Sequence, residues 1–445
     1  MVQTNSPRPS LGIWRATSLV TGNIVGVGLF MLPASLGVFG TVGLLGWLLT
    51  AAGSICLALV FARLSHAFPK IGGPYAYSRE AFGDFVGFQM AWSYWVGTWA
   101  SNAAIAIAFV SYLSFFWPEL NQNTSVSFLF SLATVWLFTI INIIGVQAAG
   151  TIQLITTILK VAPLAIIVLF GMPYIQADHF LPINPSEMPF WTAISTAAAL
   201  TLFSFVGLES ATIPAEDVEN PEKTIPRATI LGTLLAAVIY ISTMVVILGM
   251  LSPQELSQST APFADAATRI FGDIAGPLFA CAAIFSTLGT LNGWILLQGQ
   301  MPVAAARDKL FPSFFDKHTR NGSPYMALII SSSLMSAMLY MNYEAGLVEQ
   351  FTAIVSFTSF AILLPYLYST VAELYIMMTQ PHHMSKAKFI RTITIALLAF
   401  CYTILITIGA GENAVYTGMI FIFSGFPFYV WMKRGHLSAE KKGTV

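Results

Sequence analysis

Charged residues are scarce in this chain, and their scarcity excludes most classes of protein. Of the 445 residues, 9% are Asp, Glu, Lys or Arg, while 56% are hydrophobic. A soluble domain carries about 25% charged residues. The 20 basic and 20 acidic side chains also cancel, so no nucleic-acid partner is expected. The composition predicts a polytopic membrane protein embedded in a lipid bilayer.

Cysteine is also rare. The three residues Cys56, Cys281 and Cys401 each lie inside an apolar run, so neither a disulfide framework nor the ligand spacing of a metal site is indicated. An enzyme embedded in the membrane would need a nucleophile–base pair or a metal cluster at one level, and the sequence offers neither. We therefore expect no metal, no cofactor and no enzymatic activity.

Long stretches without charge are abundant. No charged residue lies between Arg15 and Arg63, which leaves room for two helices of the roughly 20 residues that cross a bilayer. The first span lacks a small-residue cleavage site and is followed at once by another, so we expect it to be retained. Counting such stretches predicts twelve spans, near residues 13–36, 41–65, 85–115, 126–146, 150–173, 192–214, 228–251, 274–304, 325–342, 348–377, 388–409 and 413–432.

The basic residues indicate how these spans are oriented. If the spans alternate in direction, every Lys and Arg except Lys160 and Arg269 falls on one side. Lys and Arg concentrate in cytoplasmic loops. The sequence therefore predicts a multi-pass protein of the cell inner membrane with both termini in the cytoplasm.

Two spans are interrupted by small residues where a membrane helix is expected to be continuous. The first contains TGNIVGVGLF at 21–30 and the sixth contains LFSFVGLESA at 202–211. The breaks lie five spans apart, an odd number, so two repeats would enter the membrane in opposite directions, as in inverted-repeat transporters. Glycines can also simply let helices pack closely, but two breaks at symmetry-related places favour a ligand site.

The ends of broken helices suit one kind of ligand. A half-helix N-terminus offers free N–H groups to a carboxylate, and a half-helix C-terminus offers carbonyls to an ammonium. An α-amino acid carries both groups. Its side chain would point away from the breaks, so we expect specificity to come from other helices.

Several motifs resemble those of the amino acid/polyamine/organocation (APC) transporter superfamily, and within it the basic amino acid/polyamine antiporter group. They are TGNIVGVGLFMLPA, GGPYAYSREAFG, FSFVGLESA, DVENPEKTIPRA and LGTLNGWILLQGQ, in the expected order. The resemblance covers nearly the whole chain. It implies an inverted five-plus-five repeat with broken first and sixth helices plus two further helices, in one domain over 1–445. Repeat one would cover about 11–175, repeat two about 190–378 and the added helices about 387–433.

The resemblance also implies site residues at matching positions. The substrate would be bound by Ile24, Gly26, Val27, Gly28, Asn102, Phe203, Val206, Trp294 and Thr358. Asn102 and Trp294 would face its side chain, and an aromatic face attracts a guanidinium or ammonium by about 0.5–2 kcal/mol. The cytoplasmic side would be closed by Tyr94, Glu209 and Tyr366.

Three positions depart from the pattern of arginine/agmatine-exchanging members of that group. Those members have a tryptophan at position 203, where this chain has Phe203, and a serine where it has Val27. Both changes make the pocket less suited to arginine without excluding a cationic substrate. The third is Lys160, in TILKVAPLAII, which resembles a lysine that replaces a sodium ion in other amino-acid transporters of the superfamily.

These observations predict a secondary active amino-acid transporter that works by alternating access. The favoured form is an antiporter for cationic or related amino acids and their amines. The alternative is a proton-coupled symporter, because Glu209 and Lys160 are ionisable residues within spans and such residues are functional by default. A channel or a substrate sensor fits less well, since two broken helices suit a single enclosed site. A homodimer is left open.

Overall fold

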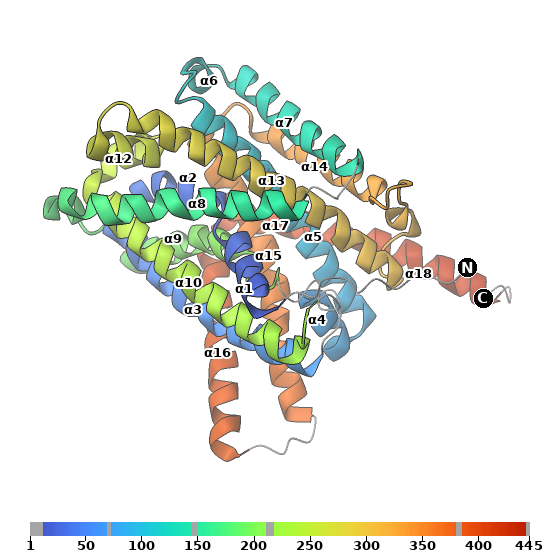
Figure 1. Ribbon diagram of the computed structural model, residues 1–445. Coiled ribbons are helices and arrows are strands. Elements are labelled where there is room, and N and C mark those ends of the chain that lie inside the picture. The colour runs from blue at the N-terminus through green and yellow to red at the C-terminus, as the bar shows by residue number, and fades with distance from the viewer. Residues whose placement is uncertain (1–11, 69–72, 145–148, 211–217, 380–384, 442–445) are drawn as a thin grey trace.

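The computed structural model describes residues 12–68, 73–144, 149–210, 218–379 and 385–441. Figure 1 shows a bundle of long helices. Their bounds are α1 Ile13–Ile24, α2 Val27–Gly37, α3 Thr41–Ala67, α4 Pro74–Phe82, α5 Asp84–Leu113, α6 Glu119–Gln122, α7 Thr124–Ile144, α8 Ala149–Gly171, α9 Phe190–Phe205, α10 Pro221–Met250, α11 Pro253–Gln258, α12 Pro262–Phe271, α13 Ala275–Arg307, α14 Tyr325–Asn342, α15 Leu347–Thr379, α16 Lys386–Gly409, α17 Glu412–Phe423 and α18 Gly425–Lys441.

The predicted spans coincide with helices. Ten helical stretches within the described residues are long and apolar enough to cross a membrane, the first of them running through α1 and α2. The two further predicted spans lie at α8 and α9. These findings confirm an all-helical polytopic membrane protein.

Two spans differ in detail from the sequence prediction. The sixth, expected at 192–214, is helical only to Phe205, because Val206 turns to extended backbone; residues 211–214 lie outside the described residues. The twelfth is divided between α17 and α18 at Ser424. Its Oγ donates to the Phe421 carbonyl at 2.6 Å, and such back-bonding by serine bends helices.

Helices from the two halves of the chain pack against each other in matched pairs. The contacts α3 with α10, α5 with α13 and α7 with α14 each join helices five spans apart. The crossed contacts match as well, because α1 packs on α10 and α9 packs on α3. A two-fold relation between the halves requires this pattern. It brings the break of the first span against the end of α9 at the centre of the bundle.

Ion pairs gather at the end of the bundle where the basic residues lie. Arg63 of α3 is paired with Glu373 of α15. Arg79 of α4 contacts Asp84 at 2.9 Å and Asp308 at 3.0 Å, tying α4 to the start of α5 and the end of α13. The loops on this side are therefore linked through charged groups, whereas the interior between the helices is apolar and closely packed.

Candidate substrate site

The first break separates α1 from α2. The helix ends at Ile24, and Val25 and Gly26 adopt extended backbone before α2 starts at Val27. No side chain caps the start of α2. Carbonyls at the end of α1 and N–H groups at the start of α2 therefore lie at the same break, since helix ends leave these groups without intrahelical partners.

The second break lies directly against the first. Gly207 follows α9 with a φ of 109°, a value that side chains disfavour, and a Cβ there would lie 3.3 Å from Asn23. Gly28 is tighter still, because its Cβ would lie 2.2 Å from the Oγ of Ser204. The glycines in the two motifs thus allow the broken backbones to touch, and a side chain at Gly28 would force them apart.

Tyr240 of α10 joins the two breaks. Its hydroxyl lies within hydrogen-bond distance of the Ile24 carbonyl, at the end of α1, and 3.0 Å from the Ser204 carbonyl, near the end of α9. The side chain is fully buried. Sequence reasoning missed this residue, because a tyrosine in an apolar run carries no sign of which distant backbone it reaches.

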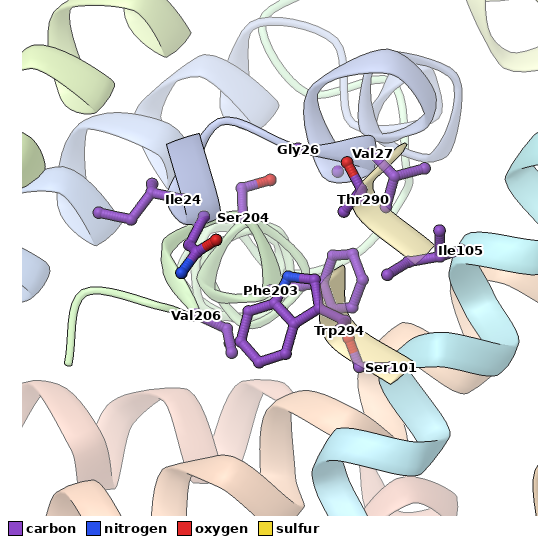
Figure 2. Close-up of a pocket in the computed structure, with 12 residues that line it drawn as sticks. Ile24, Gly26, Val27, Ser101, Ile105, Phe203, Ser204, Val206, Thr290 and Trp294 are labelled. Atoms are coloured by element: carbon purple, nitrogen blue, oxygen red, sulfur yellow. The ribbon is translucent and has the colours of Figure 1, made fainter. Parts of the chain in front are cut away.

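A small cavity of about 20 Å³ lies where the breaks meet. Figure 2 shows the rings of Phe203 and Trp294 close together on one side and the backbone of the first break on the other. Ser204 also lines the cavity, and its buried hydroxyl has no hydrogen-bond partner among the described residues. Buried polar atoms are normally paired, so this hydroxyl is available to a ligand.

Most residues expected to bind the substrate line this cavity. They are Ile24, Gly26, Val27, Gly28, Phe203, Val206 and Trp294. Asn102 and Thr358 do not line it, although both are fully buried. Asn102 instead donates from Nδ2 to the Oε1 of Gln298 at 2.8 Å. Sequence reasoning did not single out Ser101, Ile105 and Thr290, which line the cavity as well.

The three residues expected to close the cytoplasmic side lie together. The hydroxyls of Tyr94 and Tyr366 donate to the two carboxylate oxygens of Glu209, each at 2.5 Å. The Gly207 N–H donates to the same carboxylate at 3.2 Å. All three side chains are buried. The carboxylate thus joins α5 and α15 to the second break through uncharged donors.

Lys160 lies beside the first break. Its side chain is 1% exposed, and its ammonium nitrogen is 3.4 Å from the Gly22 carbonyl in the last turn of α1. The C-terminal end of a helix carries partial negative charge. The lysine is therefore placed to compensate the carbonyl end of α1, at a distance that is long for a hydrogen bond.

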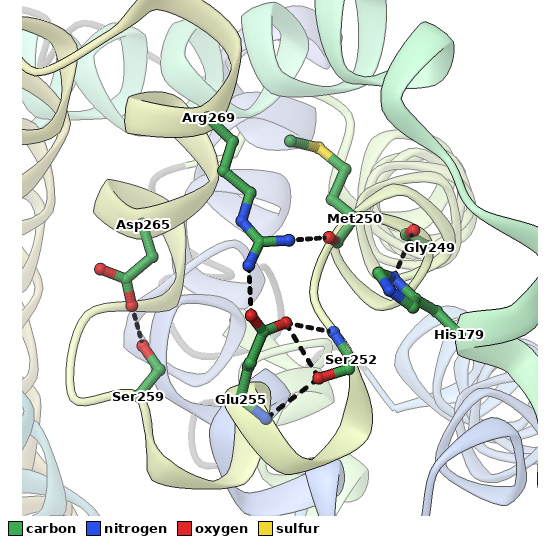
Figure 3. Close-up of polar contacts among 8 residues, drawn as sticks. All are labelled: His179, Gly249, Met250, Ser252, Glu255, Ser259, Asp265 and Arg269. Carbon is green, nitrogen blue, oxygen red and sulfur yellow. Dashed lines mark hydrogen bonds and ion pairs between the residues drawn. The ribbon is translucent and has the colours of Figure 1, made fainter.

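A second polar cluster lies at the end of the bundle opposite the Arg79, Asp84 and Asp308 network (Figure 3). Arg269 of α12 donates to the Met250 carbonyl at 2.6 Å and to Glu255 at 2.5 Å. Glu255 also accepts from the backbone N–H of Ser252 at 2.9 Å, and this bond, ahead of Arg269, holds the pKa of the carboxyl below its ordinary value. Burial raises the pKa of nearby Asp265.

Within the ranges that the structure describes, no three His, Cys, Asp or Glu side chains gather in a group that could hold a metal ion. The cavity offers backbone groups of the two breaks, the hydroxyl side chains of Ser101, Ser204 and Thr290, and aromatic rings. Such a site can bind a small zwitterion without changing it chemically.

The fold is that of a multi-pass membrane transporter, and the family and relatives of this chain are transporters, not enzymes. Comparison with known proteins gives the family: the chain belongs to the amino acid permease family, which matches residues 11–432. It is 33% identical to the putrescine transporter PotE of Haemophilus influenzae over 94% of this chain and 96% of that protein. It is 34% identical to the cadaverine/lysine antiporter of Escherichia coli over 82% and 83% of the two chains.

Proposed function

We propose that this protein is an antiporter that exchanges cationic or related amino acids and their amines by alternating access. The contact between the two broken helices carries this proposal. It encloses a cavity lined by Gly26, Val27 and Gly28 on one side and by the end of α9 on the other. Backbone N–H and C=O groups without helical hydrogen bonds are tolerated in the middle of a membrane only where they are buried in protein or line a water-filled cavity.

Each end of the substrate has a matching surface. The N–H groups at the start of α2 suit the carboxylate, because a helix N-terminus carries partial positive charge. The carbonyl of Ile24 and the free hydroxyl of Ser204 suit the ammonium. Trp294 and Phe203 line the remaining wall, where a cationic side chain would lie against aromatic faces. Asn102 and Thr358 are proposed to contact the far end of a longer substrate.

The relatives support this substrate class. One is named for putrescine, and another for cadaverine and lysine, so each carries an amine or a cationic amino acid. Phe203 and Val27 make this cavity less polar than that of arginine-exchanging members of the group. Lysine and its amine therefore suit it better than arginine.

Glu209 is proposed as the gate on the cytoplasmic side. The two tyrosines that hold it come from α5 and α15, and a hinge that opens this side has to separate them. Water entering the opened gate would replace the tyrosine hydroxyls as donors to the carboxylate. The gate would therefore respond to hydration and to the protonation of Glu209.

The orientation, domain organisation and assembly are proposed with the function. The network of Arg79, Asp84 and Asp308 lies on the side that carries nearly all the basic residues. That side is proposed to be cytoplasmic, with both termini there and the protein in the cell inner membrane.

The chain would form one domain with repeats at about 11–175 and 190–378 and added helices at about 387–433. A homodimer within the bilayer is proposed as the assembly.

Uptake by purified protein in liposomes tests the exchange. Labelled lysine should enter liposomes preloaded with lysine or cadaverine and should not enter empty ones, because an antiporter needs substrate on both sides. Protein-free liposomes give the background. Equal uptake into loaded and empty liposomes would contradict exchange, and flux that does not saturate would indicate a channel.

One observation favours a second candidate, a proton-coupled symporter. Lys160 is buried, and its ammonium nitrogen lies 3.4 Å from the Gly22 carbonyl oxygen. This distance is longer than we would expect for a lysine that stays charged and has only a structural role. If it releases its proton during the cycle, a pH gradient should drive lysine into empty liposomes, and Lys160→Ala should abolish that uptake. This outcome would replace exchange with symport.

A further inference from the structure

A chain of buried hydrogen bonds runs behind the cavity through four helices. It starts at Thr139 of α7, which lies 2.7 Å from the Oγ of Ser332 of α14. Ser332 lies 3.4 Å from the Nε2 of Gln298 of α13, and Gln298 Oε1 lies 2.8 Å from the Nδ2 of Asn102 of α5. All four side chains are fully buried. None of them lines the cavity itself.

The first link fixes the direction of every later one. Thr139 donates its single hydroxyl hydrogen to the Val135 carbonyl of its own helix at 2.7 Å. It can therefore only accept from Ser332, so Ser332 donates to it. The Ser332 oxygen then accepts from the Gln298 amide N–H, which leaves Gln298 Oε1 as the acceptor for the Asn102 amide N–H. A backbone carbonyl of α7 thereby sets the orientation of two side-chain amides.

The chain ends in an unpaired acceptor next to the cavity. Asn102 Oδ1 is buried and has no hydrogen-bond partner within the described structure. Asn102 neighbours Ser101 along α5 and lies one turn from Ile105, and both of these line the cavity. Gln298 lies one turn beyond Trp294 on α13, which also lines it. Asn102 and its partner Gln298 thus each lie within about one helical turn of residues that line the cavity.

We propose that the chain from Thr139 through Ser332 and Gln298 holds Asn102 with its oxygen as the free group, which makes Gln298 a positioning residue for substrate specificity. This inference rests on the proposed transport of amino acids. A free acceptor selects a side chain that ends in a donor, such as an ammonium, over one that ends in a methyl group. With the reverse orientation, Asn102 would present its N–H group and would repel the same ammonium.

The test compares lysine with norleucine, which has the chain of lysine without the terminal ammonium. The ratio of their inhibition constants against labelled lysine is measured in loaded liposomes. The native protein should prefer lysine. Gln298→Leu frees the Asn102 amide to turn, so the preference should fall by about tenfold, as expected when a hydrogen bond to a charged group is lost. Ser332→Ala should lower it less.

Thr139→Val provides the most specific variant, because Thr139 lies three links from Asn102. It should lower the preference for lysine by about two- to fivefold, roughly the worth of one neutral hydrogen bond. Thr134→Val is the matched control: Thr134 lies on the same helix and donates to the Phe130 carbonyl at 2.7 Å. It should leave the preference unchanged. Ser332→Ala combined with Thr139→Val should have no larger effect than Ser332→Ala alone, because both break one chain.

The outcomes separate this inference from the proposed function. If the native protein prefers lysine and its preference survives Gln298→Leu, Ser332→Ala and Thr139→Val, the positioning role is wrong and the function stands. If the native protein prefers norleucine, both are wrong. If Thr134→Val lowers the preference as much as Thr139→Val, the effect comes from α7 packing and the chain does not position Asn102. Because the two threonine variants are nearly isosteric with the native residue, they keep the test valid if Gln298→Leu fails to fold.

Discussion

Two glutamates, Glu209 at the centre of the bundle and Glu255 at its end, are stabilised by opposite means. Glu209 is fully buried, and its carboxylate accepts from two tyrosine hydroxyls and a backbone N–H. Glu255 has a 48% exposed side chain and pairs with Arg269. Charge neutralises the exposed carboxylate, whereas the buried one accepts from neutral donors among the described residues. A carboxyl group held by neutral dipoles can gain or lose a proton as its surroundings change. This property suits a residue that opens and closes the site and does not suit a purely structural contact.

Glu209→Gln should have the largest effect. The amide keeps the shape but loses the charge and turns N–H hydrogens toward one tyrosine donor, so transport should fall at least about tenfold, since a hydrogen bond to a charged group contributes about 1.5–3 kcal/mol. The remaining transport should lose its pH dependence. Uptake is measured across a pH series.

Glu373→Gln is the control for that variant. Glu373 is also buried, but it is paired with Arg63 away from the cavity. It should lower thermal stability and leave the pH profile of transport intact. A native pH profile in Glu209→Gln would assign the pH dependence to another group.

Tyr240→Phe should come next in size. Removing the hydroxyl leaves a buried carbonyl at one of the two breaks without a donor, which costs about 1–3 kcal/mol. Both the melting temperature and the affinity for substrate should fall. Tyr112→Phe is matched to it, because the buried Tyr112 hydroxyl donates at 2.8 Å to the Phe30 carbonyl inside α2. If both variants lose stability and neither loses affinity, Tyr240 has no part in the site.

Trp294→Leu should weaken lysine binding by about 0.5–2 kcal/mol, the range of a cation–π contact. Norleucine should be affected less, because it has no cation to lose that contact. Inhibition constants for both compounds measure the difference, and the melting temperature shows whether the variant is folded. If the kinetics of lysine transport are unchanged, Trp294 does not contact the substrate side chain.

Glu255→Gln should have the smallest effect, because exposed ion pairs contribute less than about 1 kcal/mol. The folded-state pKa of Glu255 is lowered from 4.5, so its stabilisation is present above that value and is lost as the pH falls through the lower, folded-state pKa. Melting temperatures of the native protein and the variant should differ slightly at pH 7 and converge in acid. A transport defect at pH 7 would give this end of the molecule a role in gating.

The parts of the site that lie close together in sequence could be predicted. The glycines near Val27 and Gly207 reveal the breaks, because glycine within an apolar run is visible without knowing its neighbours. Lys160 also stands out, since a charged residue within a span is rare. The grouping of Tyr94 and Tyr366 with Glu209 came from the resemblance to the antiporter group, and in the structure these three side chains are in contact.

The parts that depend on contacts between distant helices could not be predicted. Tyr240 and Gln298 are ordinary residues in apolar runs, and their partners lie on other helices. The position of Asn102 depends on which face of α5 turns toward the cavity, and one residue along a helix rotates a side chain by about 100°. Ser101 therefore lines the cavity and Asn102 does not.

The single hydroxyl hydrogen of Tyr240 cannot be donated to both of the carbonyl oxygens that the hydroxyl contacts. The hydroxyl faces two carbonyls, those of Ile24 and Ser204, but has a single hydrogen to donate. An arriving substrate ammonium supplies three more. The tyrosine can then commit to one carbonyl while the ligand takes the other. Substrate binding would therefore complete a set of hydrogen bonds that Tyr240 alone cannot satisfy.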